Sequence, residues 1–267
     1  MLRARLVQGS VLKKVVEVTR NVAGERANLV FSTTGFSLQA NNLSVTAMVA
    51  IVLPSDAFDC YDCDRTISIG VNLDSMFRIF RVSSDDDIVT IKALHGVDYV
   101  TFIFESPRQD KVSEFMTKEI HVDQEQLLHI SEVEYHAILE TESHAILKMP
   151  SVVFARICSE LADVGDSVTI KITEKAAKFS TKGELGTSTI VCRQNLDVDK
   201  PEEAVVIEMN ETVSMTFSLR LINSFTRAAP LSNTVTISFV SEMPSVFEYK
   251  IAETGYARFF LRPREEY

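Results

Sequence analysis

Most of the chain alternates apolar and polar residues with a period of two, which is typical of short β-strands with one buried face. Residues 87–94, 98–106, 167–173, 186–194, 234–240 and 246–252 follow this pattern. Turn signals separate the runs at Thr34-Gly35, Asp85–Asp87, Lys182-Gly183 and Ser232-Asn233. The apolar run 45–53, VTAMVAIVL, predicts a buried strand and is much shorter than the roughly 18 residues of a membrane span.

Four short segments have helical periodicity instead: residues 10–20, 72–81, 151–164 and 219–229. The first places Val11, Leu12, Val15, Val16, Thr19 and Val22 in one stripe, and we place Val18 on the opposite side. The third has the same spacing, 142 residues later (153 − 11), with Val153, Phe154, Ile157, Cys158, Leu161 and Val164. The other two direct Leu73, Met76, Phe77 and Phe80, and Leu221, Ile222, Phe225 and Ala229, inward.

The strands that follow each helix also repeat, so the sequence predicts two copies of one α+β unit. We expect a first domain at 1–118, an inter-domain connector at 119–147 and a second domain at 148–267. A length of 267 residues, 46% of them hydrophobic, is sufficient for two packed cores.

Charge is distributed unevenly between the predicted helices and the connections. The chain has 27 Lys+Arg against 37 Asp+Glu, yet the polar sides of all four helices are basic. Those cations are Lys13, Lys14, Arg20, Arg78, Arg81, Arg156, Arg220 and Arg227. The acidic residues gather at 85–87, 123–142, 197–203 and 265–266. Basic faces on short helices fit weak, sequence-independent contact with duplex phosphates, and no base-reading motif is present.

Signatures of an enzyme are weak. The chain has only nine Gly and lacks GxxxxGK[ST], GxGxxG, GxSxG and HExxH. Cys60 and Cys63 form a CxxC without the second pair that zinc requires, and they lie in a strand-like segment, so we interpret them as reduced strand cysteines. His129, His136 and His144 share the acidic connector, which keeps a metal-dependent hydrolase as a remote alternative. The N-terminus lacks the apolar core of a signal peptide, so we expect the chain to stay inside the cell.

A series of motifs, in order along nearly the whole chain, resembles proliferating cell nuclear antigen (PCNA), the eukaryotic sliding clamp family. They are ARLVQGSVLKKVVE, CDRTISIGVNLDSM, KMPSVVFARIC, GELG, EEAVVIEMNE, PLSNTVTIS and EYKIA. The resemblance implies two clamp domains per chain and three chains joined head to tail in a ring. The short helices line a channel for double-stranded DNA. The ring tethers DNA polymerase and other replication and repair proteins in the nucleus, and a separate ATP-driven clamp loader opens it. Neither catalytic activity nor a cofactor, metal ion or membrane is implied.

By position, the resemblance makes the eight helix cations the channel residues. It places the subunit joint at Lys111–Phe115 of one chain and Thr187–Cys192 of the next, with Lys111, Phe115, Thr189 and Val191 as contact residues. It also implies an outer pocket for a short partner motif, at Asn41, Val45, Thr46, Met48, Leu127, Ile130, Pro244, Phe260 and Pro263. Asp64 and Arg65 match a DNA-binding-region signature of the family.

The sequence departs from the family pattern at several points. Asn41 replaces a typical Met, Val45 replaces a typical His, and Glu174 stands at the position of the modifiable lysine. The repeat HAILETESHAIL lengthens the connector. These departures support an alternative, in which the chain is a specialised clamp paralogue acting in a heterotrimeric, checkpoint-type ring.

Overall fold

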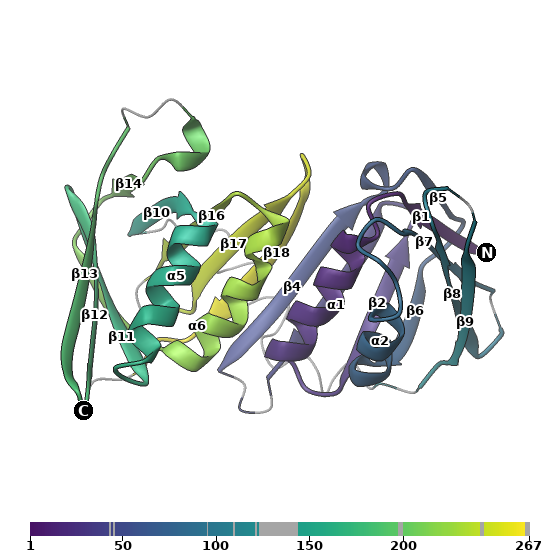
Figure 1. Cartoon of the computed structure of the whole chain (residues 1–267), viewed down its shortest axis with the longest axis horizontal. Coiled ribbons are helices and arrows are strands. Elements are labelled where there is room, and N and C mark those ends of the chain that lie inside the picture. The colour runs from purple at the N-terminus through teal and green to yellow at the C-terminus, as the bar shows by residue number, and fades with distance from the viewer. Residues whose placement is uncertain are drawn as a thin grey trace. The chain divides into compact units, whose positions relative to one another are not determined.

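The computed structural model describes residues 1–42, 44, 46–94, 96–108, 110–120, 122, 144–196, 200–240 and 243–264. The chain divides into two compact units, the first built mainly from the N-terminal half and the second mainly from the C-terminal half. In each unit, antiparallel strands form sheets and a pair of short helices packs together (Figure 1). This matches the α+β class that the sequence predicts.

The first unit contains β1 (Leu2–Leu6), α1 (Ser10–Val22), β2 (Arg26–Ser32), β3 (Gly35–Asn41), β4 (Ala47–Pro54), a 3-10 turn (Ser55–Ala57), β5 (Cys60–Cys63), β6 (Ile67–Asn72), α2 (Leu73–Phe80), β7 (Ile88–Ala93), β8 (Tyr99–Glu105) and β9 (Val112–Lys118). One sheet has the strand order β5-β1-β7-β8-β9, and a second series has the order β6-β2-β3-β4. Strand β9 forms an edge of the first sheet.

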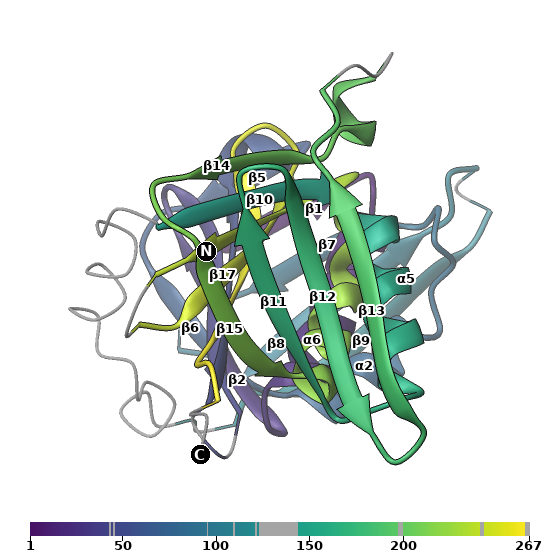
Figure 2. The ribbon, with the colours of Figure 1, turned by 90° about the vertical axis from the view of Figure 1, so that its left-hand side faces the viewer.

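The second unit contains β10 (Ala145–Pro150), α5 (Ser151–Ala162), β11 (Ser167–Thr173), β12 (Ala176–Gly183), β13 (Gly186–Arg193), a 3-10 turn (Pro201–Glu203), β14 (Val206–Met209), β15 (Val213–Ser218), α6 (Leu219–Phe225), a 3-10 helix (Thr226–Leu231), β16 (Thr234–Phe239), β17 (Ser245–Ile251) and β18 (Gly255–Leu261). One sheet has the order β13-β12-β11-β15, seen face-on in Figure 2, and a second series runs β14-β10-β16-β17-β18. Since β10 begins at Ala145, the last residues of the expected connector belong to this unit's sheet.

The strand pairings confirm the internal repeat. In the first unit, β1 pairs with β5 and β7, while β2 pairs with β3 and β6. In the second, β10 pairs with β14 and β16, while β11 pairs with β12 and β15. The two patterns correspond strand for strand, so the repeated spacing of the sequence reflects one topology used twice.

Each unit buries its own aromatic core beneath the helices. In the first, the Phe80 ring lies 5.6 Å from that of Phe102 and 5.3 Å from that of Phe104, centroid to centroid. In the second, the Phe247 ring lies 5.6 Å from that of Phe225. At the start of α2, the side chain of Asn72 accepts a hydrogen bond from the Ser75 amide at 2.8 Å, which satisfies a free N–H of the first turn. The apolar stripes of the helices therefore face these cores, and the polar sides face outward.

Several details differ from the sequence prediction. The placement of Val18 opposite the stripe is wrong: it is fully buried, because 3.6 residues per turn place it on the same side of the helix as Val11, seven residues earlier. The last predicted helix is shorter as an α-helix, since Thr226–Leu231 is a 3-10 helix containing Pro230, which lacks an amide hydrogen. Leu219 is buried there, whereas Leu221 is only half-buried.

Candidate nucleic-acid interface

The cations predicted for the first domain come from α1 and α2, which pack against each other. Lys13, Lys14 and Arg20 project from the polar side of α1, and Arg78 and Arg81 are exposed on and just after α2. We call these five residues the first helix face. The two helices thus combine their positive charge on one surface of the unit.

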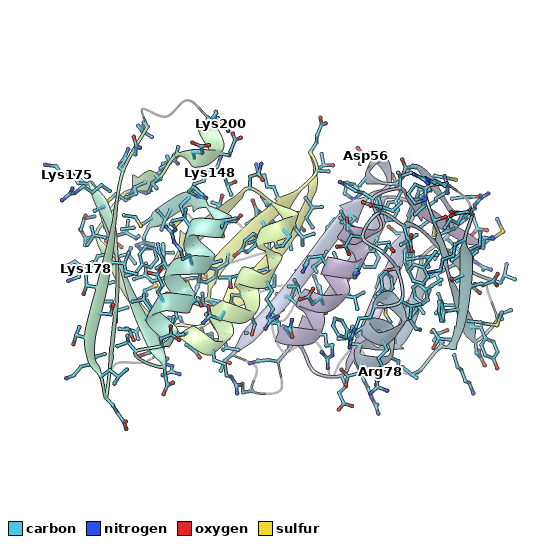
Figure 3. All side chains as sticks on the ribbon, in the orientation of Figure 1. Asp56, Arg78, Lys148, Lys175, Lys178 and Lys200 are labelled. Carbon is cyan, nitrogen blue, oxygen red and sulfur yellow. The ribbon has the colours of Figure 1, made fainter. Side chains whose placement is uncertain are left out.

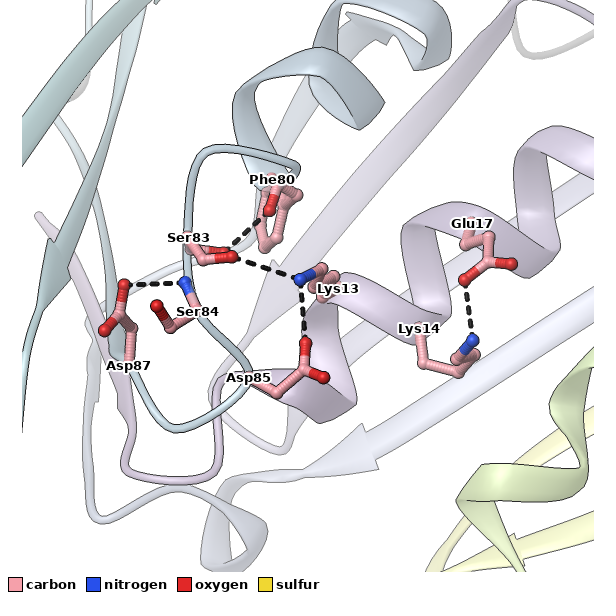
Figure 4. A network of polar contacts seen from close by, with 8 residues as sticks. All are labelled: Lys13, Lys14, Glu17, Phe80, Ser83, Ser84, Asp85 and Asp87. Carbon is pink, nitrogen blue, oxygen red and sulfur yellow. Dashed lines mark hydrogen bonds and ion pairs between the residues drawn. The ribbon is translucent and has the colours of Figure 1, made fainter.

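Lys13 is held by the turn that connects α2 to β7 (Figure 4). Its Nζ donates to the Ser83 carbonyl oxygen at 3.1 Å and to Asp85 Oδ1 at 2.7 Å. Ser84 N donates to Asp87 Oδ2 at 2.9 Å, which orders the same turn. The hydrogen bond and charge of Lys13 lower the pKa of the Asp85 carboxyl below its ordinary value. Lys13 is therefore a paired cation in the free chain.

The other two cations of α1 also have acidic neighbours. Lys14 Nζ contacts Glu17 Oε2 at 2.6 Å, one turn along the same helix. Arg20 forms an ion pair with Asp74 of α2, and its guanidinium carbon lies 4.7 Å from the centroid of the Phe77 ring. Arg20 thus joins the two helices by charge and by a cation–π contact. Sequence reasoning assigned these side chains to a ligand and missed the pair between Arg20 and Asp74.

Arg78 and Arg81 complete the first helix face, and both are exposed. Neither forms an ion pair with another described residue. Arg78 and Arg81 are therefore the cations of this face that are most available to an anion.

The second unit carries Arg156 on α5, Arg220 on α6 and Arg227 on the following 3-10 helix, which we call the second helix face; all three are exposed. The helices α5 and α6 pack together, and Asn223 Nδ2 donates to the Cys158 carbonyl oxygen at 3.4 Å. Arg156 approaches Glu160 at 3.8 Å, but both side chains are more than half exposed, so this pair adds little stability. The second face repeats the first with fewer cations.

The residues predicted for a subunit joint lie on two sheet edges. Lys111 precedes β9 and Phe115 lies within it, while Thr189 and Val191 lie on β13. Both β9 and β13 end the strand order of their sheets among the described residues. Each edge also exposes an apolar side chain, Val112 with 61% and Val191 with 52% of its surface accessible. Exposed apolar groups on an open edge strand favour pairing with another chain.

The residues of the predicted partner pocket occupy varied environments. Asn41, Met48, Pro244 and Phe260 are buried, whereas Thr46 is exposed and Pro263 is half-buried. Val45, Leu127 and Ile130 lie outside the described residues. Of the described positions, Thr46 and Pro263 present the accessible surface for a partner.

The other candidate chemistry has structural explanations. Cys60 and Cys63 are free thiols at the two ends of strand β5. Asp64 pairs with the N-terminal ammonium at 2.7 Å, which lowers the pKa of its carboxyl.

His144 pairs with Glu211, while His129 and His136 lie outside the described residues. Among the described ranges, no group of three or more His, Cys, Asp or Glu side chains is arranged to hold a metal ion. In that same part of the chain, no helix has the length and apolar character needed to cross a membrane.

Comparison with known families matches both units. The family model for the N-terminal domain of proliferating cell nuclear antigen matches residues 1–126, and the one for the C-terminal domain matches residues 137–264. The chain belongs to the PCNA family. Its two units are accordingly the two domains of a PCNA-type DNA clamp, and the helix faces described above are borne by α1 and α2 in one domain and by α5 and α6 in the other. Residues 127–136 lie between the two matches.

Proposed function

We propose that this chain is the subunit of a homotrimeric DNA sliding clamp that encircles duplex DNA and acts as a polymerase processivity factor. The observation that carries the proposal is the repeated pair of basic helix faces, one in each PCNA domain of a chain with net charge −10. The clamp is a scaffold without catalytic activity, and it works in the nucleus, where replication and repair take place.

Weak contact is what a sliding clamp requires. A closed ring stays on DNA because of its topology, so the cations need only keep the phosphates centred without binding tightly. The ion pairs of Lys13, Lys14 and Arg20 fit this role, since they reduce the net charge that the first helix face offers. The exposed arginines supply the remaining attraction, among them Arg78, Arg81, Arg156 and Arg220.

We infer that β9 of one subunit pairs with β13 of the next to close the ring. Every strand pair among the described residues for which we give a register is antiparallel, so we take this pair to be antiparallel as well. The register that places Val112 opposite Val191 joins two exposed apolar side chains on the solvent side. The same register brings Asp110 opposite Arg193, a pair of opposite charge.

Partners reach the clamp through a short motif that fits the outer pocket, in which Thr46 and Pro263 are accessible. DNA polymerase, the clamp loader and repair proteins are the expected partners. Since Asn41 and Val45 differ from the family pattern, we expect the preferred motif to differ as well.

The channel assignment is tested by reversing charge at Arg81 and Arg156, one on each helix face. Because both side chains are exposed, the substitutions Arg81→Glu and Arg156→Glu leave the fold intact. We expect clamp-stimulated DNA synthesis to fall at physiological salt, while Lys92→Glu, on an exposed position of β7, leaves it unchanged. Equal stimulation by the double variant and the Lys92 control would show that DNA does not pass along these helices.

A heterotrimeric ring built with related chains is the second candidate. The observation in its favour is Asn41, a polar residue that is buried at the end of β3 where relatives carry Met. A changed pocket suits a clamp with its own set of partners. The native mass of the isolated chain separates the two candidates.

A further inference from the structure

The solvent side of the sheet β13-β12-β11-β15 has a charge opposite to that of the chain. Its four strands read GTSTIVCR, AAKFSTKG, SVTIKIT and VSMTFS, and none contains Asp or Glu. Lys171, Lys178 and Lys182 are exposed on these strands, and Lys175 is exposed in the turn between β11 and β12. We call these four residues the lysine face; Lys175 and Lys178 are visible on the side of the sheet away from α5 (Figure 3). Glu174 and Glu184 lie in the hairpin turns between these strands, and Asp166 and Glu211 come just before β11 and β15.

The corresponding sheet of the first unit, β6-β2-β3-β4, is different. Its four strands contain neither Lys nor Asp nor Glu, and Arg26 at the start of β2 is their single charged residue. None of the four lysines has an ion pair among the described residues. The lysine face is therefore a local feature of one sheet and does not follow from the fold.

The positions of two of the lysines destabilise the sheet. Lys171 and Lys178 are directly opposite each other on β11 and β12. Like charges at directly opposed positions of an antiparallel pair are destabilising. Lys182 continues the row along β12, roughly 13 Å from Lys178 at the usual rise per residue. A bound anion between Lys171 and Lys178 would remove their repulsion.

The geometry of the face favours a peptide over a nucleic acid. The proposed path of duplex DNA follows the helix faces, and α5 packs against the other side of this sheet. An extended peptide has the same rise per residue as a β-strand, so carboxylates four residues apart on it match the spacing of Lys178 and Lys182 along β12. The hydroxyls of Thr169 and Thr216, 2.9 Å apart on the adjacent strands, add neutral polar contacts.

We propose that the lysine face docks an extended acidic segment of a partner protein. This surface is distinct from the helix faces, because the opposite face of the sheet packs against α5. It is also distinct from the edge of β13 that we assign to the subunit joint, since Lys171, Lys178 and Lys182 lie on inner strands. The proposal does not depend on whether the ring is homotrimeric.

The probe is a fluorescein-labelled peptide of twelve residues, alternating Glu and Asp, and its binding is followed by fluorescence anisotropy. We expect saturable binding at 150 mM salt, and about fivefold weaker binding by Lys178→Glu, equivalent to the loss of one or two charge contacts. Lys250→Glu, at an exposed position of β17 in the same unit, is the matched control and keeps the affinity.

The same variant separates docking from folding. Lys178→Glu replaces a like-charge pair opposite Lys171 with an attractive one, so the melting temperature stays the same or rises while the peptide affinity falls. Equal peptide affinity for Lys178→Glu and Lys250→Glu would overturn the proposal. So would a loss of binding to a 30-base-pair duplex without a loss of peptide binding, which would assign the face to nucleic acid. Unchanged clamp-stimulated synthesis by Lys178→Glu keeps this test separate from that of the channel.

Discussion

At the scale of single residues, the helix cations differ in how far a carboxylate already holds them. The sequence pattern placed Lys13 on the polar side of its helix, but it carried no sign of Asp85, which is 72 residues away. That contact depends on the close approach of the residue before α1 to the turn before β7. The approach requires glycine at position 9, because a Cβ atom there would lie 2.2 Å from the Asp87 carbonyl oxygen. The partner of Lys14, by contrast, follows from the spacing of Glu17 on one helix.

Removing the carboxylate of Asp85 is expected to strengthen DNA contact. Asp85→Asn abolishes the ion pair with Lys13 and releases one positive charge on the first helix face. We predict a few-fold tighter binding of duplex DNA and a salt dependence of the affinity that is steeper by about one charge. Titration of a labelled duplex at several salt concentrations measures both.

Asp86→Asn provides the control, because this neighbouring carboxylate is also exposed. The pH dependence of stability gives a second check. Since Lys13 lowers the pKa of Asp85, the pair stabilises the fold above the ordinary carboxyl value of 3.8, and this contribution is lost as pH falls through the lowered pKa. Asp85→Asn therefore changes the stability profile above that pH and converges with the unmodified chain below it. Identical DNA affinity for both variants would mean that Asp85 does not restrain Lys13.

At the scale of elements, periodicity predicted the helices and most strands because one face of each is buried. The predicted strand at 167–173 is β11, and the predicted helix at 151–164 is α5, which ends at Ala162. The 3-10 geometry after Phe225 was not predicted, since a shift from a 3.6- to a 3.0-residue turn leaves little trace in a short apolar pattern. The sequence indicated the open sheet edges at β9 and β13 only through the family resemblance.

A charge exchange tests the strand register that we infer for the subunit joint. Arg193→Asp places two acidic residues opposite each other at the joint, because Asp110 lies across from it. We predict that this variant loses trimer, and that the double variant with Asp110→Arg regains it by restoring opposite charges. Sedimentation velocity of the single and double variants measures the assembly.

Lys111→Asp serves as the matched control in that experiment, since Lys111 is the exposed neighbour of Asp110 just before β9. In the inferred register, Lys111 faces Cys192, so the substitution Lys111→Asp cannot rescue Arg193→Asp. Trimer that persists in Arg193→Asp, or rescue by both second substitutions alike, would contradict the register.

At the scale of the whole molecule, the repeat was predictable because each half must bury a core of its own. The strands of the two units correspond pair for pair, and each unit has its own cluster of phenylalanines. Assembly was not predictable in the same way, because it depends on how two exposed edges fit. Val112 and Val191 fit an ordinary strand pattern in the sequence. Only the folded sheets show that both are exposed on edge strands.

The native mass of the isolated chain decides between the homotrimeric and heterotrimeric rings. If β9 and β13 of identical chains complement each other, light scattering should give three times the chain mass of 29.9 kDa over a wide range of protein concentration. A closed ring has three equal joints and exposes no further edge, so the mass should stop at three chains and not grow into filaments. A monomer that persists at high concentration, together with an intact fold by circular dichroism, would contradict the homotrimer and favour a ring that requires related subunits.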